Sequence, residues 1–157
     1  MNLKELNDEE LVSMYPSLIS ELKEREIIRT DNVVGEIGEY LAINQYNKTP
    51  GLPKLIRTAK STKNIDAVSN KGERYSIKTI TTSTTGVIHG VDTIENKLFE
   101  KLIIVQLDKK FVLKKVIEID WATFFKHKKW HSTMKAHNIQ VTKSLLDDAV
   151  LIYSDEN

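Results

Sequence analysis

Hydrophobic and polar residues alternate with helical spacing in the first third of the chain. Asn7 is suited to cap a first helix, because the acidic residues that follow it favour the positive end of a helix. Pro16 lacks the amide hydrogen that a helix interior requires, so we expect one helix to end there and another to begin at residue 17. The polar run 30–32 offers a second cap, and the pattern of residues 33–46 predicts the next helix.

Strand patterns dominate the rest of the chain, beginning after a loop rich in Pro and Gly at 47–53. Runs rich in β-branched and aromatic residues predict strands at 54–59, 64–69, 74–80, 101–107, 111–119 and 149–153. Between them we expect a loop at 81–86, short helices at 92–100 and 121–127, and a helical turn at 144–148, whereas residues 126–140 fit no pattern. This order predicts an α/β (α+β) fold with a central mixed sheet flanked by helices.

Composition narrows the class of protein. The length of 157 residues predicts a single domain over 1–157. The absence of cysteine excludes disulfides, thiolate metal sites and a cysteine nucleophile. The acidic N-terminus has no long apolar run, so we expect neither a signal peptide nor a membrane span, and we expect a cytoplasmic protein.

Charge is unevenly distributed along the chain, although its net value is only +1. Residues 1–30 carry −3, residues 48–78 carry +6 and residues 109–143 carry +7. If the two basic segments share a face, they could attract a polyanion. Alternatively, their lysines only solvate strand edges and helix surfaces.

Two of the predicted strands each carry a charged residue within an apolar run, Asp66 in the first and Lys78 in the second. A three-residue loop over 70–72, with Gly72 in a left-handed conformation, would set Asp66 opposite Ser76. A two-residue loop would set Asp66 opposite Ile77 instead. We favour the three-residue loop because it gathers the apolar side chains on one face, namely Ile65, Ala67, Tyr75 and Ile77.

That register places Asp66, Ser76 and Lys78 on the other face and predicts a shared polar site. A plain salt bridge between Asp66 and Lys78 on a solvated face is the alternative.

The helix before this hairpin carries two glycines and two glutamates. Gly35 and Gly38 each cost about 1 kcal/mol relative to alanine, which indicates close packing against a neighbour. Apolar residues flank Glu39 on both sides of the helix, so we expect this carboxylate to be partly buried, with Glu36 one turn away. A buried carboxylate requires a cation or a proton. A solvent-facing Glu39 is the alternative.

These residues together resemble the motif of the PD-(D/E)XK nuclease superfamily, which has the restriction-endonuclease-like fold. The helix carries Gly-x-x-x-Glu ending at Glu39, one strand carries Asp66, and the next carries Ser76-Ile77-Lys78. The resemblance covers about residues 31–119, which leaves 1–30 as a helical extension and 120–157 as an elaboration of the core.

The resemblance implies a nuclease that hydrolyses phosphodiester bonds with Mg²⁺ or Mn²⁺. We expect DNA as its substrate, with RNA as the alternative. Asp66 would be the central metal ligand, Glu39 a direct or water-mediated ligand, and Lys78 the residue that orients the attacking water. Many such nucleases act as homodimers. This chemistry is reasonable, because Mg²⁺ prefers oxygen ligands and is held by one or two carboxylates.

One departure from the motif matters most: Ser76 stands where the family has Glu or Asp. It removes one anionic ligand, although Glu36 could supply another. A nuclease fold without catalysis, binding nucleic acid or a protein partner, is therefore the alternative function.

Further residues are candidates for contacts with nucleic acid. The hydroxyls of Thr79 and Thr81 could donate hydrogen bonds to phosphates. Lysines could contact the nucleic-acid backbone, and an aromatic ring could stack on a base; the lysines are Lys60, Lys63, Lys128 and Lys129, and the ring is that of Trp130. His127 and His131 have the spacing of a helical metal pair, but without a third ligand motif we expect ordinary surface histidines.

Overall fold

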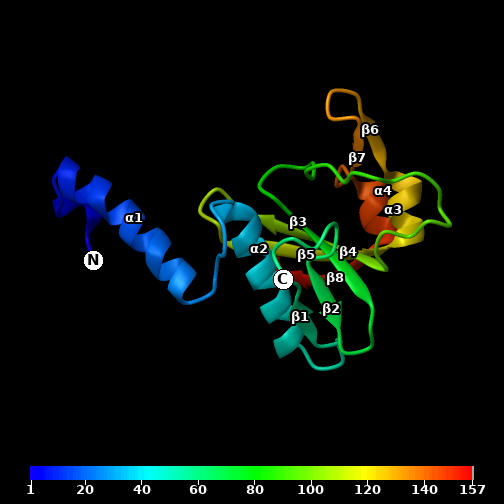
Figure 1. Ribbon diagram of the computed structural model, residues 1–157, viewed down its shortest axis with the longest axis horizontal. Helices are drawn as coiled ribbons and strands as arrows, with labels where there is room; N and C mark the ends of the chain where they lie inside the picture. Colours follow the sequence, from blue (N-terminus) through cyan, green and yellow to red (C-terminus); the bar gives the residue numbers. More distant parts are fainter. Residues whose placement is uncertain (157) are drawn as a thin grey trace.

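A six-stranded mixed β-sheet forms the centre of the molecule in the computed structural model, which describes residues 1–156 (Figure 1). Its strands lie in the order β1 (Leu55–Arg57), β2 (Ala67–Ser69), β3 (Arg74–Ile80), β4 (Lys101–Leu107), β5 (Leu113–Asp120) and β8 (Val150–Ser154). β3 and β4 are parallel, and all other neighbours in this sheet are antiparallel. The predicted α+β class with a central mixed sheet is confirmed.

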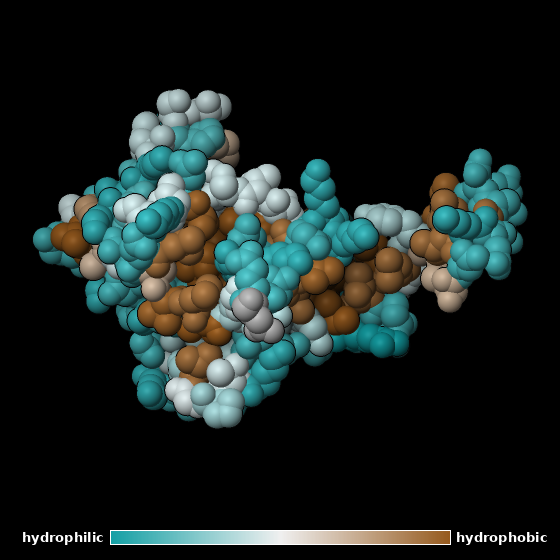
Figure 2. All heavy atoms as spheres, turned by 180° about the vertical axis from the view of Figure 1, so that it is seen from behind, coloured by the Kyte–Doolittle hydropathy of each residue, from teal (hydrophilic) through white to brown (hydrophobic). Residues whose placement is uncertain are grey.

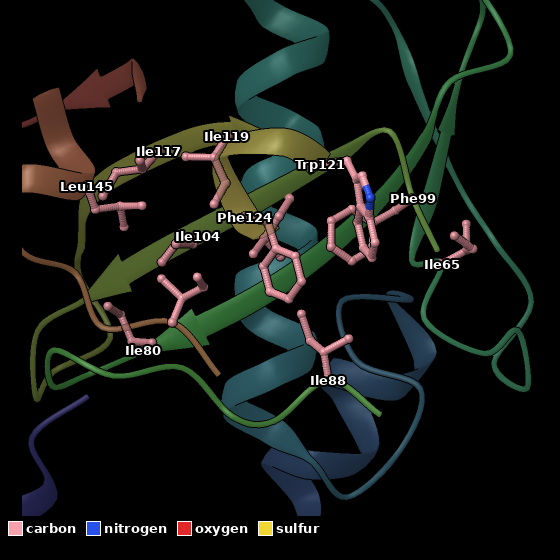
Figure 3. Close-up of a cluster of buried hydrophobic side chains, with 12 residues drawn as sticks. Ile65, Ile80, Ile88, Phe99, Ile104, Ile117, Ile119, Trp121, Phe124 and Leu145 are labelled. Carbon is pink, nitrogen blue, oxygen red and sulfur yellow. The ribbon is translucent and has the colours of Figure 1, made fainter. Parts of the chain in front are cut away.

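Helices cover both faces of the sheet. The helix α2 (Val33–Lys48) packs on one face, and α3 (Trp121–His127), α4 (Lys143–Asp148) and the segment 81–100 pack on the other (Figure 1). The core on the second face contains the aromatic cluster of Phe99, Trp121 and Phe124 (Figure 3). β4 is an almost continuous hydrophobic run because it contributes side chains to both cores.

The β2–β3 hairpin adopts the predicted three-residue register. Ala67 pairs with Tyr75, and Gly72 has φ of +84°, a region that favours glycine. The expectation for Ile65 is wrong, because its side chain lies in the core on the opposite face from Ala67. β2 begins only at Ala67, and Asn64 has φ of +59°, so the strand alternation does not reach back to Ile65.

The N-terminal region contains a short 3₁₀ helix, η1 (Leu3–Glu5), and one uninterrupted helix, α1 (Asp8–Glu24). Asn7 caps α1 in a capping box, as its sequence predicts. The expected break at Pro16 is wrong. The proline sits on an exposed surface of the helix, where water can bond the carbonyl that the ring leaves free, and the Ser17 hydroxyl bonds the neighbouring carbonyl of Ser13.

Two further segments differ from the sequence prediction. Residues 92–100 form turns, because the Asp92 carboxylate binds the Thr93 amide and the indole of Trp121 donates to the carbonyl of Ile94. The unassigned segment 126–140 forms a second sheet of β6 (Lys129–His131) and β7 (Ala136–Asn138).

Within residues 1–156, no helix has both the length and the apolar character needed to span a bilayer.

Candidate functional site

A polar cleft opens where β2 stops accompanying β3. Because β2 begins at Ala67, the residues of β3 from Ile77 onward have no partner on that side. The first half of α2 lies against this open edge and leaves a cleft of about 390 Å³. Its lining includes Gly35, Glu39, Asp66, Lys78, Thr79 and Gly86.

Close contact between α2 and β3 sets the width of this cleft. A Cβ added to Gly38 would lie 1.8 Å from the Thr79 hydroxyl, and that hydroxyl lies 3.4 Å from the carbonyl oxygen of Gly35, to which it donates. The prediction of close packing at the helix glycines is therefore confirmed at Gly38. Since Glu39 and Lys78 are the chain neighbours of Gly38 and Thr79, this contact brings both charged residues to the cleft.

The Asp66 carboxylate completes the open edge of β3. Its Oδ2 accepts a hydrogen bond of 2.6 Å from the amide of Ile77, which no strand residue bonds at this position. Burial raises the pKa of Asp66, while the Ile77 amide, the Lys78 charge and the Ser76 hydroxyl each act to lower it. Asp66 is thus a buried, oriented carboxylate that borders the cleft.

Glu39 is mostly buried, with 16% of its side chain exposed. Burial is the largest cause that raises its pKa to about 6, followed by the negative charge of Asp66, whereas Arg57 acts to lower it. The repulsion shows that Glu39 and Asp66 share one electrostatic environment. The expectation of a partly buried Glu39 is confirmed.

Two arginines that the sequence reasoning missed hold the glutamates of α2. Arg57 reaches Glu39 at 3.2 Å and Glu36 at 3.1 Å, and Arg29 lies 3.6 Å from Glu39. A signal was present, because Arg57 is a charged residue in the interior of a predicted strand, as Asp66 and Lys78 are.

Glu36 faces these arginines and the backbone, so it does not line the cleft. Its Oε2 accepts the Arg29 amide at 2.5 Å, and its Oε1 accepts the Thr30 hydroxyl at 3.4 Å. The structure therefore gives Glu36 a role in anchoring the start of α2.

Lys78 and Ser76 occupy different positions relative to the cleft. Lys78 lines it and, among the described residues, forms no ion pair with Asp66 within 4.0 Å. Ser76 is buried, at 1% exposure, beside Asp66 and outside the lining. Its hydroxyl acts to lower the pKa of the Asp66 carboxyl group.

The cleft offers few protein ligands for a hard divalent cation, which prefers oxygen atoms. Within residues 1–156 no group of three or more His, Cys, Asp or Glu side chains is placed to hold a metal. The two carboxylates of Glu39 and Asp66 could hold Mg²⁺ if water supplied the remaining ligands, which is the usual habit of this ion. Metal binding would also oppose the repulsion that raises the pKa of Glu39.

The predicted nucleic-acid contacts fall into two groups. Lys60, Lys63 and Thr81 are exposed in the loops next to Asp66 and after β3. Trp130, 61% exposed, and Lys129 lie on β6, and Lys128 precedes it with its ammonium 3.8 Å from the Phe125 ring centroid.

The β6–β7 hairpin is tied to the cleft by the segment 84–88. His137 of β7 pairs with Trp130 on one side and with Ile88 on the other, and Gly86 of this segment lines the cleft. With about 4.8 Å between strands, β6 lies roughly 10 Å from segment 84–88. Figure 1 shows the hairpin projecting beside the long loop that follows β3.

The two histidines of this region lie in different elements. His127 ends α3 and contacts Asp148 at 2.7 Å, whereas His131 is in β6 and accepts the Met134 amide. Each histidine thus has its own local hydrogen-bond partner.

Comparison with protein-family models finds none that matches this chain, and comparison with curated proteins finds no similar sequence.

Proposed function

We propose that this protein is a divalent-metal-dependent nuclease of the PD-(D/E)XK type that cleaves DNA. The observation that carries the proposal is that Glu39, Asp66 and Lys78 line one polar cleft. Glu39 comes from α2, Asp66 directly precedes β2, and Lys78 comes from β3. Perturbed carboxylates that gather beside a lysine are typical of sites that do chemistry. The proposal includes a cytoplasmic location and a homodimer.

Each residue of the cleft has a defined role in this proposal. Asp66 and Glu39 would hold Mg²⁺ or Mn²⁺, which supplies activation of water and neutralises charge on the phosphate. Lys78, free of an ion pair with Asp66, would bind a phosphate oxygen and orient the attacking water. Arg29 and Arg57 would keep the Glu39 carboxylate in position, and the buried Ser76 would orient Asp66.

The strand-binding surface in this proposal runs from the cleft to the β6–β7 hairpin. Segment 84–88 joins the two, and Lys129 and Trp130 lie two strand spacings, about 10 Å, beyond it. An exposed indole with neighbouring lysines suits stacking on a base and contact with phosphates. Lys60, Lys63 and Thr81 would contact the nucleic-acid backbone nearer the cleft, whereas the predicted Thr79 hydroxyl already donates to the carbonyl of Gly35.

Cleavage of single-stranded, duplex and branched DNA and of RNA, with Mg²⁺ and Mn²⁺ titrated, tests the proposal. We expect Asp66→Asn and Lys78→Ala to lose cleavage by roughly 100-fold or more, because each removes a charge that acts on the transition state. Lys71→Ala is the matched control, since Lys71 is an exposed lysine in the turn of the same hairpin. Equal cleavage by the native protein and both cleft variants would overturn the assignment.

A binding module without catalysis is the second candidate, favoured by the buried Ser76 in place of an acidic ligand. It predicts that DNA binds with no cleavage at any metal concentration. Trp130→Ala would then weaken binding, whereas Asp66→Asn would leave it unchanged.

A further inference from the structure

The helix α1 is an arm that the rest of its own chain leaves largely exposed. It has 17 residues, none of them buried, and Figure 1 shows it extending away from the sheet. Most of the stability of a protein helix comes from the packing of its apolar face rather than from helix propensity. An arm of this kind is expected to pack against another surface.

One side of the arm carries the spacing of a helix-pairing seam. Leu11, Tyr15, Leu18 and Leu22 follow one another at intervals of four, three and four residues. Leu11, Tyr15 and Leu18 are 45%, 66% and 56% exposed. Figure 2 shows hydrophobic side chains gathered along the arm and where it meets the body.

A groove at the base of the arm continues this apolar surface onto the body. It has a volume of about 320 Å³ and is lined by residues that include Tyr15, Leu18, Leu22, Val33, Ile37 and Phe111. Phe111 is exposed in the turn between β4 and β5, and its φ of +61° is rare for an aromatic residue. The turn therefore holds an apolar ring at the rim of the groove at a conformational cost.

The arm and the β4–β5 turn carry opposite charges. The arm begins with Asp8, Glu9 and Glu10. Lys109 and Lys110 directly precede Phe111, the turn residue that lines the groove; both lysines are exposed and, in the described part of the chain, belong to no ion pair. The acids are too far along the arm to lie in their own groove, which is lined from Tyr15 onward. The groove of a second molecule can receive them.

We propose that a second copy of this chain covers the arm. Two α1 helices pair antiparallel about their midpoint near Met14, so that Leu11 of one lies against Leu18 of the other. The first half of each arm fills the groove of its partner, and Asp8–Glu10 face the partner's β4–β5 turn. The pairing is self-complementary, so both grooves and both seams are covered at once, as a two-fold interface requires. It does not depend on the proposed nuclease activity.

Sedimentation of the full chain across a concentration series tests the pairing. The native protein should sediment with twice the mass of one chain. Leu18→Glu places two charges in the dimer seam and should weaken association by roughly 100-fold or more. Ser20→Glu is the matched control, because it adds the same charge to the exposed, opposite side of α1 and should remain dimeric. A monomer at all concentrations, or a Leu18→Glu dimer as stable as the native one, would overturn the proposal.

Charge reversal tests the contact without altering the apolar seam. Lys110→Glu should weaken the dimer, and adding Asp8→Lys to the same chain should restore it. If the double variant is as weak as Lys110→Glu alone, the arm does not reach the partner's turn.

Cross-linking tests whether the two α1 helices run antiparallel. Because the chain has no cysteine of its own, only introduced cysteines can form a disulfide. A mixture of the Asp8→Cys and Lys110→Cys variants should form a disulfide between the two variants under mild oxidation. Disulfides only between two Asp8→Cys chains would show parallel arms and overturn the antiparallel arrangement.

Discussion

Gly38→Ala is the substitution that most directly tests how α2 and β3 form the cleft. In an isolated helix this change is stabilising by about 1 kcal/mol. Here the new methyl group would lie 1.8 Å from the Thr79 hydroxyl and 2.7 Å from its Cβ and Cγ2, so helix and strand have to move apart. Overpacking of this kind costs about 1–3 kcal/mol.

The expected net effect is a destabilisation of up to about 2 kcal/mol, because the gain in helix propensity offsets about 1 kcal/mol of the overpacking cost. For a chain of this size that corresponds to a fall of up to roughly 8 °C in melting temperature. Urea unfolding followed by circular dichroism measures the free energy of unfolding directly.

Gly35→Ala in the same helix is the control. Its methyl group would meet the Asn32 side-chain amide at 2.5 Å, the end of a side chain that can rotate away, so this variant should equal or exceed the native stability. Thr79→Ala should reduce the cost of Gly38→Ala in a double-mutant cycle, since it removes the nearest clashing atom. If Gly38→Ala is as stable as Gly35→Ala, Gly38 does not determine the spacing of helix and strand.

Three further predictions concern the hairpin and the carboxylates. The pKa of Glu39 is raised from 4.5 to about 6, so its contribution to stability is present below pH 4.5 and is lost as pH rises through 6. Between pH 4.5 and 7.5 the free energy of unfolding should therefore fall by about 1–2 kcal/mol less in Glu39→Gln than in the native protein. Parallel pH profiles of the two proteins would contradict this. Gly72→Val should destabilise the fold by about 1–2 kcal/mol through backbone strain alone, since no atom lies within 4 Å of the new Cβ, whereas Gly86→Val, without positive φ, should cost less. Ser76→Glu should lower the melting temperature without metal, because it buries a second carboxylate beside Asp66. Mn²⁺ should then raise the melting temperature of this variant more than that of the native protein. Equal increases in the two proteins would argue against a metal between residues 66 and 76.

Local patterns were sufficient for several elements of the fold, including the strand at the cleft. The bounds of β3, β4 and α3 follow from the sequence, because each has a strong pattern and clear turn or cap residues. The β2–β3 register followed from one glycine and the alternation of apolar residues. These features depend on residues that are neighbours in sequence, so one sequence is enough to predict them.

Features that depend on distant partners could not be predicted in this way. The β6–β7 hairpin is stabilised by pairing of β7 with Ile88, nearly fifty residues earlier in the chain, and the polar sequence of 126–140 does not show that pairing. The carbonyl of Ile94 is bonded by the Trp121 indole, which overrides the helical pattern of 92–100. Arg57 joins Glu36 and Glu39 only because β1 crosses beside the start of α2.

The crossover between β3 and β4 has a consequence for the order in which the sheet forms. Parallel strands are usually joined through a helix, yet these two are joined by residues 81–100 without one, whereas β4 and β5 are joined by residues 108–112. Closing the longer connection costs about 1 kcal/mol more in chain entropy. β3 should therefore join a preformed β4–β5 hairpin, and its amides should exchange with solvent hydrogen before those between β4 and β5. The cleft then lies in the half of the sheet that opens first, so it can widen while the β4–β5 half stays folded.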